Sequence, residues 1–252
     1  MTNPILLAAL AACGTYLLTV IGTLPVLLFQ SVPRRAMDAM MGFAAGVMVA
    51  ASCWSLLVPA IESGGVLVAT VGLLAGGAFL YAADQMLPHL HGVFPDEATP
   101  EGPRVDWHRP ALLMFAMTLH NFPEGMAVGV SFGGGDLGSA VALAIGIGLQ
   151  NVPEGLAIAM PLRRSGMTPG RAFFWGQLSA VVEPPAAALG AALVLASSAF
   201  LPYGMAAAAG AMLYVVVEEL IPETVRTGVT DVATLGFIAG FAVMMALDNA
   251  LG

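Results

Sequence analysis

The stretch His120-Asn-Phe-Pro-Glu124-Gly-Met-Ala127 returns 30 residues later as Gln150-Asn-Val-Pro-Glu154-Gly-Leu-Ala157. Asn, Pro, Glu, Gly and Ala recur in place. Each copy lies inside a long apolar run, at about 110–132 and about 137–162. Because about 20 apolar residues cross the hydrocarbon core of a bilayer as a helix, the two copies are predicted on adjacent membrane helices of opposite direction.

The rest of the chain has the composition of a membrane protein. Of its 252 residues, 58% are hydrophobic and only 10% are charged, whereas soluble domains carry about 25% charged residues. The net charge of −8 leaves no basic face and excludes nucleic acid as a partner. Cys13 and Cys53 lie in apolar runs and form neither a disulfide framework nor a CxxC site. The bilayer is therefore the expected environment.

Eight apolar runs are long enough to span a membrane, at about 5–29, 39–61, 65–87, 110–132, 137–162, 172–198, 203–221 and 232–250. All the basic side chains fall in alternate loops between these runs: Arg34, Arg35, Arg104, Arg109, Arg163, Arg164, Arg171 and Arg226. The positive-inside rule places these loops in the cytoplasm and both termini outside. We predict an all-α integral membrane protein, residues 1–252 forming one eight-helix domain, multi-pass in a bacterial inner membrane.

The longest loop, residues 88–109, lies on the predicted cytoplasmic side. It is acidic and contains His89 and His91. Two interpretations are equally supported by its composition. It is either an ordinary solvated loop or a weak metal contact made by the two imidazoles and nearby carboxylates.

Three carboxylates lie deep in the apolar runs, namely Glu124, Glu154 and Glu183, and no arginine is placed to pair with them. Ionisable groups at membrane depth are costly and indicate function. Helical spacing puts His120 and Asn121 on the face of Glu124. Gln150 and Asn151 repeat this arrangement around Glu154.

If the two faces oppose each other, they supply an imidazole, two carboxylates and several amides, which suits a divalent transition metal such as zinc. Pro123 and Pro153 also free helical carbonyls, which at membrane depth must meet protein, water or an ion. The alternative is a pair of proline-kinked helices with protonated, purely structural glutamates.

These motifs resemble the ZIP (Zrt-/Irt-like) family of divalent metal transporters. The resemblance covers the whole chain and extends to Ala180-Val-Val-Glu183-Pro184 and to the segment Gly210–Glu223. It implies eight transmembrane helices in a 3+2+3 inverted-repeat arrangement, a homodimer, and a binuclear metal site at midmembrane depth. The metal is then the transported substrate and not a cofactor: Zn²⁺ first, with Cd²⁺, Fe²⁺ and Mn²⁺ as other candidates.

By motif position, the resemblance assigns one metal site to Met48, His120, Glu124, Gln150 and Glu154. It assigns the second metal site to Asn121, Glu124, Asn151, Glu154 and Glu183. Ser55 and Glu62 are placed on the outer route, and Asp38, His89, His91, Glu219 and Glu223 on the inner route. Gln150 and Asn151 are neutral where many relatives have His or Asp, so the second site is expected to be weaker.

The resulting expectation is import of metal ions from outside into the cytoplasm, with the direction taken from the resemblance. In models of the family's mechanism, one helix bundle binds the metal and slides against a second bundle that serves as a scaffold. A membrane-embedded metalloenzyme is the first alternative, but the chain has no HExxH motif and no evident Ser–His dyad. A cation channel or a proton–cation antiporter using the same carboxylates is the second. We therefore expect no enzymatic activity.

Overall fold

The computed structural model describes residues 3–86, 89–91, 99–101, 109–225 and 230–252, and within these it is almost entirely helical. The elements in chain order are α1 (Pro4–Thr23), η1 (Leu24–Leu27), α2 (Arg34–Ala50), η2 (Ala51–Leu57), α3 (Val58–Met86), β1 (His89–His91), β2 (Thr99–Glu101), α4 (Arg109–Gly133), α5 (Leu137–Arg164), α6 (Pro169–Leu178), η3 (Ser179–Val182), α7 (Glu183–Ala196), α8 (Phe200–Val215), η4 (Val216–Leu220), α9 (Ile221–Val225) and α10 (Asp231–Leu251).

The prediction of an all-α protein is confirmed for the described residues, with one local addition. Within the predicted cytoplasmic loop, β1 and β2 pair antiparallel, with His89 opposite Glu101. Three-residue strands are too short to leave a signal in hydrophobic periodicity, which needs about four residues of alternation. The two strands form a two-stranded sheet and leave the fold class unchanged.

The helices begin where the sequence provides caps. The Asn3 side chain accepts a hydrogen bond from the Ile5 N–H, and Pro4 occupies the first helical turn of α1. The Asp136 side chain accepts from the Gly138 N–H at the start of α5. Asp136 therefore has the ordinary capping role of an acid at a helix N-terminus.

Every predicted apolar run falls on helix. The second and third runs share one stretch, Arg34–Met86, which is 53 residues long. Gly65 interrupts it with a φ of 81°, a conformation that side chains with a Cβ rarely adopt. Among the described residues, six helices are long and apolar enough to cross a membrane, with Arg34–Met86 counted once and α4 not included. The prediction of eight crossings therefore stays a prediction.

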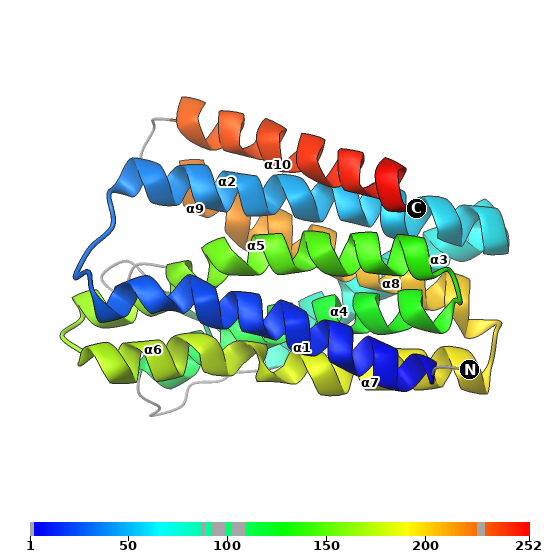
Figure 1. Ribbon diagram of the computed structural model, residues 1–252, viewed down its shortest axis with the longest axis horizontal. Helices are drawn as coiled ribbons and strands as arrows, with labels where there is room; N and C mark the ends of the chain where they lie inside the picture. The colour runs from blue at the N-terminus through cyan, green and yellow to red at the C-terminus, as the bar shows by residue number, and fades with distance from the viewer. Residues whose placement is uncertain (1–2, 87–88, 92–98, 102–108, 226–229) are drawn as a thin grey trace.

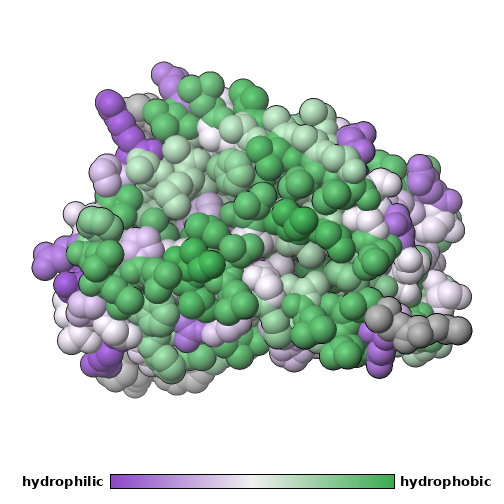
Figure 2. Space-filling view, in the orientation of Figure 1, coloured by the Kyte–Doolittle hydropathy of each residue, from purple (hydrophilic) through white to green (hydrophobic). Residues whose placement is uncertain are grey.

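The long helices run along one axis, and both chain ends lie at the same end of the bundle (Figure 1). Figure 2 shows hydrophobic side chains over the middle of one face, with hydrophilic residues mainly toward the two ends of the long axis. This is the surface expected of a protein surrounded by lipid tails. The exposed apolar side chains include Leu28, Leu67 and Met86.

The helices pack as two groups. The most extensive pairings are α2 with α10, α3 with α8, α4 with α7, and α1 with α5. We call α1, α4, α5, α6 and α7 the carboxylate bundle, because it contains Glu124, Glu154 and Glu183. We call α2, α3, α8, α9 and α10 the flanking bundle.

Candidate metal centre

The two copies of the repeated motif meet inside the carboxylate bundle. The Gln150 Nε2 donates a hydrogen bond to the Glu124 Oε1 at 2.7 Å, joining α5 to α4. Both side chains are completely buried. The two helical faces therefore meet at this pair, which the sequence analysis had left as a condition.

Glu183 joins the same region from the first turn of α7, where Pro184 and Pro185 follow it. The Asn151 Nδ2 donates to the Glu183 Oε1 at 2.9 Å, and also to the backbone oxygen of Thr15 at 3.3 Å. The Glu183 Oε2 is hydrogen-bonded to the Thr15 hydroxyl. Thr15, on α1, was not among the predicted site residues. The signal for it was available, since Thr15, Thr19 and Thr23 recur at intervals of four residues in an otherwise apolar helix.

Several buried polar atoms in this region have no hydrogen-bond partner among the described residues. The oxygens are Glu124 Oε2, Gln150 Oε1 and Asn151 Oδ1. Buried oxygens without donors are destabilising and rare in folded proteins. A divalent cation accepts such oxygens as ligands, so this donor set fits a metal ion better than it fits an apolar core.

His120 lies at the border between the two bundles. Its Nε2 is 2.7 Å from the Glu219 Oε1, so α4 is joined to η4 of the flanking bundle. Glu154, which is 4% exposed, lines a small cavity of about 20 Å³ together with His120 and Glu219. The motif had placed Glu219 on the inner route, whereas in the structure it is a direct neighbour of a predicted centre residue.

The predicted ligands do not yet converge on one point. Within the part of the chain that the structure describes, no group of three or more His, Cys, Asp or Glu side chains lies close enough to hold a metal ion. Gln150 and Asn151 hydrogen-bond to two of the carboxylates, while Glu219 engages the imidazole of His120. The residues form one buried polar region, with the oxygen ligands and the imidazole turned to different partners.

The remaining predicted centre residues come from α2 and α4. Met48 is completely buried on α2, just before the π-helical turn η2. The Ser52 hydroxyl, in η2, is buried and has no partner among the described residues. Asn121 is 3% exposed, and its Nδ2 likewise has no partner there. π-Helical turns are often found at functional sites, because they displace side chains from the regular helical spacing.

On the predicted outer route, the Ser55 hydroxyl donates to the Asp248 Oδ1 at 2.7 Å. Glu62 is exposed. Asp248, which was not among the predicted site residues, therefore lies beside the predicted outer route.

Asp136, at the start of α5, has a different environment. The side-chain hydroxyl of Ser139 and the N–H of Gly138 hold the pKa of Asp136 below its usual range.

On the predicted inner route, Arg34 holds two acids. Its Nε is 2.7 Å from the Asp38 Oδ1, and its Nη2 is 3.1 Å from the Glu223 Oε1. Its Nη2 also donates to the Glu223 backbone oxygen at 2.7 Å. The side chains of His89 and His91 lie outside the described part of the chain.

One inner-route residue was missed by the sequence analysis. Asp84, which is 6% exposed, lines a cavity of about 10 Å³ together with His120, Glu218 and Glu219. It lies near the end of α3, where sequence reasoning expects an acid to be exposed to solvent. Its burial beside other acids shows only in three dimensions.

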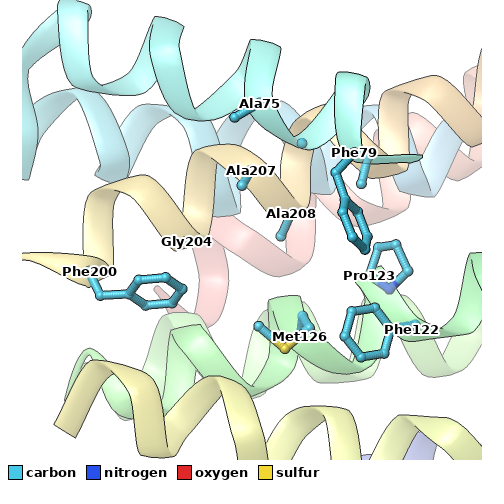
Figure 3. Close-up of a pocket in the computed structure, with 11 residues that line it drawn as sticks. Ala75, Phe79, Phe122, Pro123, Met126, Phe200, Gly204, Ala207 and Ala208 are labelled. Carbon is cyan, nitrogen blue, oxygen red and sulfur yellow. The ribbon is translucent and has the colours of Figure 1, made fainter. Parts of the chain in front are cut away.

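The larger cavity of about 230 Å³ is not the predicted centre. It lies between the two bundles, with Phe122, Pro123 and Met126 of α4 facing Ala207 and Ala208 of α8 (Figure 3). All its lining residues are apolar side chains or glycine. It offers no ligand atoms for a metal, so size does not identify the site here.

Comparisons with known proteins identify zinc transporters as relatives of this chain. The family model described as ZIP Zinc transporter matches residues 107–248. The human zinc transporter ZIP11 is 38% identical, over 97% of this chain and 97% of its own. Zinc transporter GufA of Myxococcus xanthus is 40% identical, over 93% and 94%. Zinc transporter ZIPB of Bordetella bronchiseptica is 41% identical, over 97% and 81%.

Proposed function

The chain belongs to the ZIP family of zinc transporters, and from that premise we propose that it imports divalent transition-metal ions, with Zn²⁺ as the main substrate, through a binuclear site in the carboxylate bundle. It is a multi-pass membrane protein. Its metal is a transported substrate, and its relatives are named as transporters and not as enzymes.

The observation that carries the proposal is the set of buried oxygens at the contact of α4 and α5. Glu124 Oε2, Gln150 Oε1 and Asn151 Oδ1 lack hydrogen-bond donors within the described residues. Buried carboxylates without a cation are destabilised by loss of hydration. A dehydrated metal ion supplies the missing charge, and exchange between several oxygen ligands lets the ion leave again.

In the proposed first site, Met48, His120, Glu124, Gln150 and Glu154 bind the ion. In the proposed second site, Asn121, Glu124, Asn151, Glu154 and Glu183 bind another. Glu124 and Glu154 bridge the two, because each carboxylate has two oxygens. The thioether and imidazole of the first site favour zinc and cadmium over magnesium or calcium.

The proposed route enters past Glu62 and Ser55 and leaves past Glu219, Asp38 and Glu223, with His89 and His91 beyond them. The 2.7 Å contact between the His120 Nε2 and the Glu219 Oε1 supports an exit on this side, because it joins a proposed ligand directly to the inner route. We place the arginine-rich loops in the cytoplasm and both termini outside. Both chain ends at one end of the bundle are consistent with the eight crossings of a 3+2+3 inverted repeat (Figure 1).

We further propose that the chain works as a homodimer in a bacterial inner membrane. Release of the ion requires the two bundles to shift relative to each other. In this proposal, release of the ion separates His120 from Glu219, whose side chains are in contact at the border between the two bundles.

The test is Zn²⁺ and Cd²⁺ uptake into proteoliposomes containing wild type or the variants Glu124→Ala and Glu124→Gln. We expect uptake by wild type and a loss of about 100-fold or more in both variants, because a bridging ligand serves both ions. Ser131→Ala is the matched control, since Ser131 is also buried on α4 but lies outside the proposed ligand set. Uptake by Glu124→Ala at the wild-type rate would contradict the proposed site.

A further inference from the structure

Each carboxylate oxygen of Glu183 makes one hydrogen bond with a protein group. The Asn151 Nδ2 donates to its Oε1 at 2.9 Å, and the Thr15 hydroxyl is bonded to its Oε2. Glu183 is completely buried, and Thr15 is 2% exposed. This differs from Glu124, whose Oε2 has no partner among the described residues.

Thr15 holds the Oε2 of Glu183 in either protonation state. A threonine hydroxyl has one proton and two lone pairs. Its Oγ1 lies 2.9 Å from the backbone oxygen of Ala12, which is its second acceptor. With an ionised Glu183, the hydroxyl donates to the carboxylate. With a protonated Glu183, the carboxyl donates to the Thr15 oxygen, and the hydroxyl donates to Ala12.

The neighbouring amide is oriented for a metal. Asn151 uses its Nδ2 on Glu183 and on the Thr15 backbone oxygen, so its Oδ1 has no partner in the described part of the chain. Asn151 therefore offers its Oδ1 to an ion, and Glu183 offers the lone pairs that its two hydrogen bonds leave free. The bond that fixes the Glu183 Oε2 is the one made by Thr15.

We infer that Thr15 is a positioning residue of the second metal site, whose hydroxyl holds the Glu183 Oε2 in place for the ion and strengthens Zn²⁺ binding there. The inference rests on the proposed binuclear site. A carboxylate oxygen has two lone pairs, so the Glu183 Oε2 can accept the Thr15 hydroxyl and still bind a metal. Hydrogen bonds of this kind orient metal-binding carboxylates, and their loss weakens metal binding by about 10- to 100-fold.

The inference is tested by Zn²⁺ binding to purified full-length protein in detergent, measured by calorimetry for wild type and Thr15→Val. Valine keeps the shape of threonine and lacks the hydroxyl. In the variant, the Glu183 Oε2 loses this partner and the carboxylate is no longer held in place, so the second-site Kd should rise about tenfold. The first-site Kd should stay unchanged. Thr15→Ser, which restores a hydroxyl, should bind like wild type.

Thr19→Val is the matched control. Thr19 lies one turn along the same helix, is also 2% exposed, and its hydroxyl has no partner among the described residues. It should leave both binding constants unchanged. Thr15→Ala provides a second variant without the hydroxyl, should Thr15→Val fail to fold.

Two ions bound by wild type, with the same or a lower second-site Kd in Thr15→Val and Thr15→Ala, would overturn the role of Thr15 and leave the proposed transport site intact. A wild-type protein that binds a single Zn²⁺ would overturn the second site itself, and with it this inference. The two failures are therefore distinguishable by the stoichiometry of wild type.

Discussion

The carboxylate bundle and the flanking bundle contain buried acids with different kinds of partner, shown by Glu124 in the first and by Asp38 and Glu223 in the second. In the flanking bundle, Asp38 and Glu223 are buried beside the cation of Arg34. In the carboxylate bundle, the hydrogen bond found for Glu124 comes from the neutral amide of Gln150. A buried acid beside an arginine is electrically compensated, whereas one beside an amide is not. We therefore assign Asp38 and Glu223 a role in stability and Glu124 a role in binding a cation.

The two bundles resemble each other in how their helices approach. A Cβ on Gly129 of α4 would lie 2.1 Å from the Ala187 backbone oxygen, and a Cβ on Gly46 of α2 would lie 2.0 Å from that of Phe237. Helix backbones thus touch inside each bundle, as small residues permit in membranes. Between the bundles, a Cβ on Gly146 would instead meet the Met244 Sδ at 2.2 Å.

The largest effect should separate these two kinds of contact. Gly129→Ala and Gly46→Ala should each destabilise the protein by about 3 kcal/mol, because the opposing backbone cannot move aside. Gly146→Ala should cost less than about 1 kcal/mol, because the end of the Met244 side chain can move. Thermal unfolding in detergent measures this. Gly14→Ala is the control, since nothing lies within 4 Å of its added Cβ. Equal losses at all three contact sites would remove the distinction.

Removing the compensating cation should have the next largest effect. Arg34→Ala should lower the free energy of unfolding by about 2 kcal/mol, because it leaves Asp38 and Glu223 buried without it. The figure is below that of a fully buried pair, since the Arg34 side chain is 28% exposed. Arg34→Lys should recover part of the loss. A stable Arg34→Ala variant would show that these acids do not need this cation.

Gln150→His tests the carboxylate bundle by replacing the neutral amide beside Glu124 with a stronger metal ligand. An imidazole is a better zinc ligand than an amide oxygen. We expect about a tenfold lower Kd for Zn²⁺ at the first site, equal to about 1.4 kcal/mol. Calorimetric titration measures it. Weaker binding would show that the hydrogen bond between Gln150 and Glu124 supports the metal-bound state.

The smallest effect concerns Asp136 at the start of α5, a carboxylate that neither contacts Arg34 nor belongs to the proposed metal ligands. Its folded pKa is lowered by the Ser139 hydroxyl and the Gly138 N–H. Its stabilising contribution is therefore complete above the unfolded pKa of about 3.9 and is lost as the pH falls through the folded value. Asp136→Asn keeps the cap and should remove this pH dependence of the melting temperature. An unchanged acid profile would contradict the capping role.

Much of the framework could be predicted from sequence, because membrane spans require long apolar runs and these are visible in one dimension. Helical spacing and the repeat placed Glu124 and Gln150 on two polar faces that could oppose each other. The recurring threonines of α1 mark a polar face, but the bond between Thr15 and Glu183 could not be predicted, since 168 residues separate the two and no motif contains Thr15.

The inner side was harder to predict for a different reason. Arg34 was read only as a marker of topology, yet it also bridges two acids of separate helices. The π-helical turns η2 and η4 shift Ser52, Ser55 and Glu219 away from regular helical spacing. Periodicity cannot anticipate such a shift, because nothing in the amino-acid pattern marks it.

The central claim is that the buried oxygens at the contact of α4 and α5 hold the transported ion. The most direct measurement is anomalous X-ray diffraction from crystals grown with Zn²⁺. The account predicts a peak at about 2.0–2.2 Å from an oxygen of Glu124, with Gln150 or Asn151 in its coordination shell. Zinc found only beside Asp84, Glu218 and Glu219, or only at the surface, would contradict it.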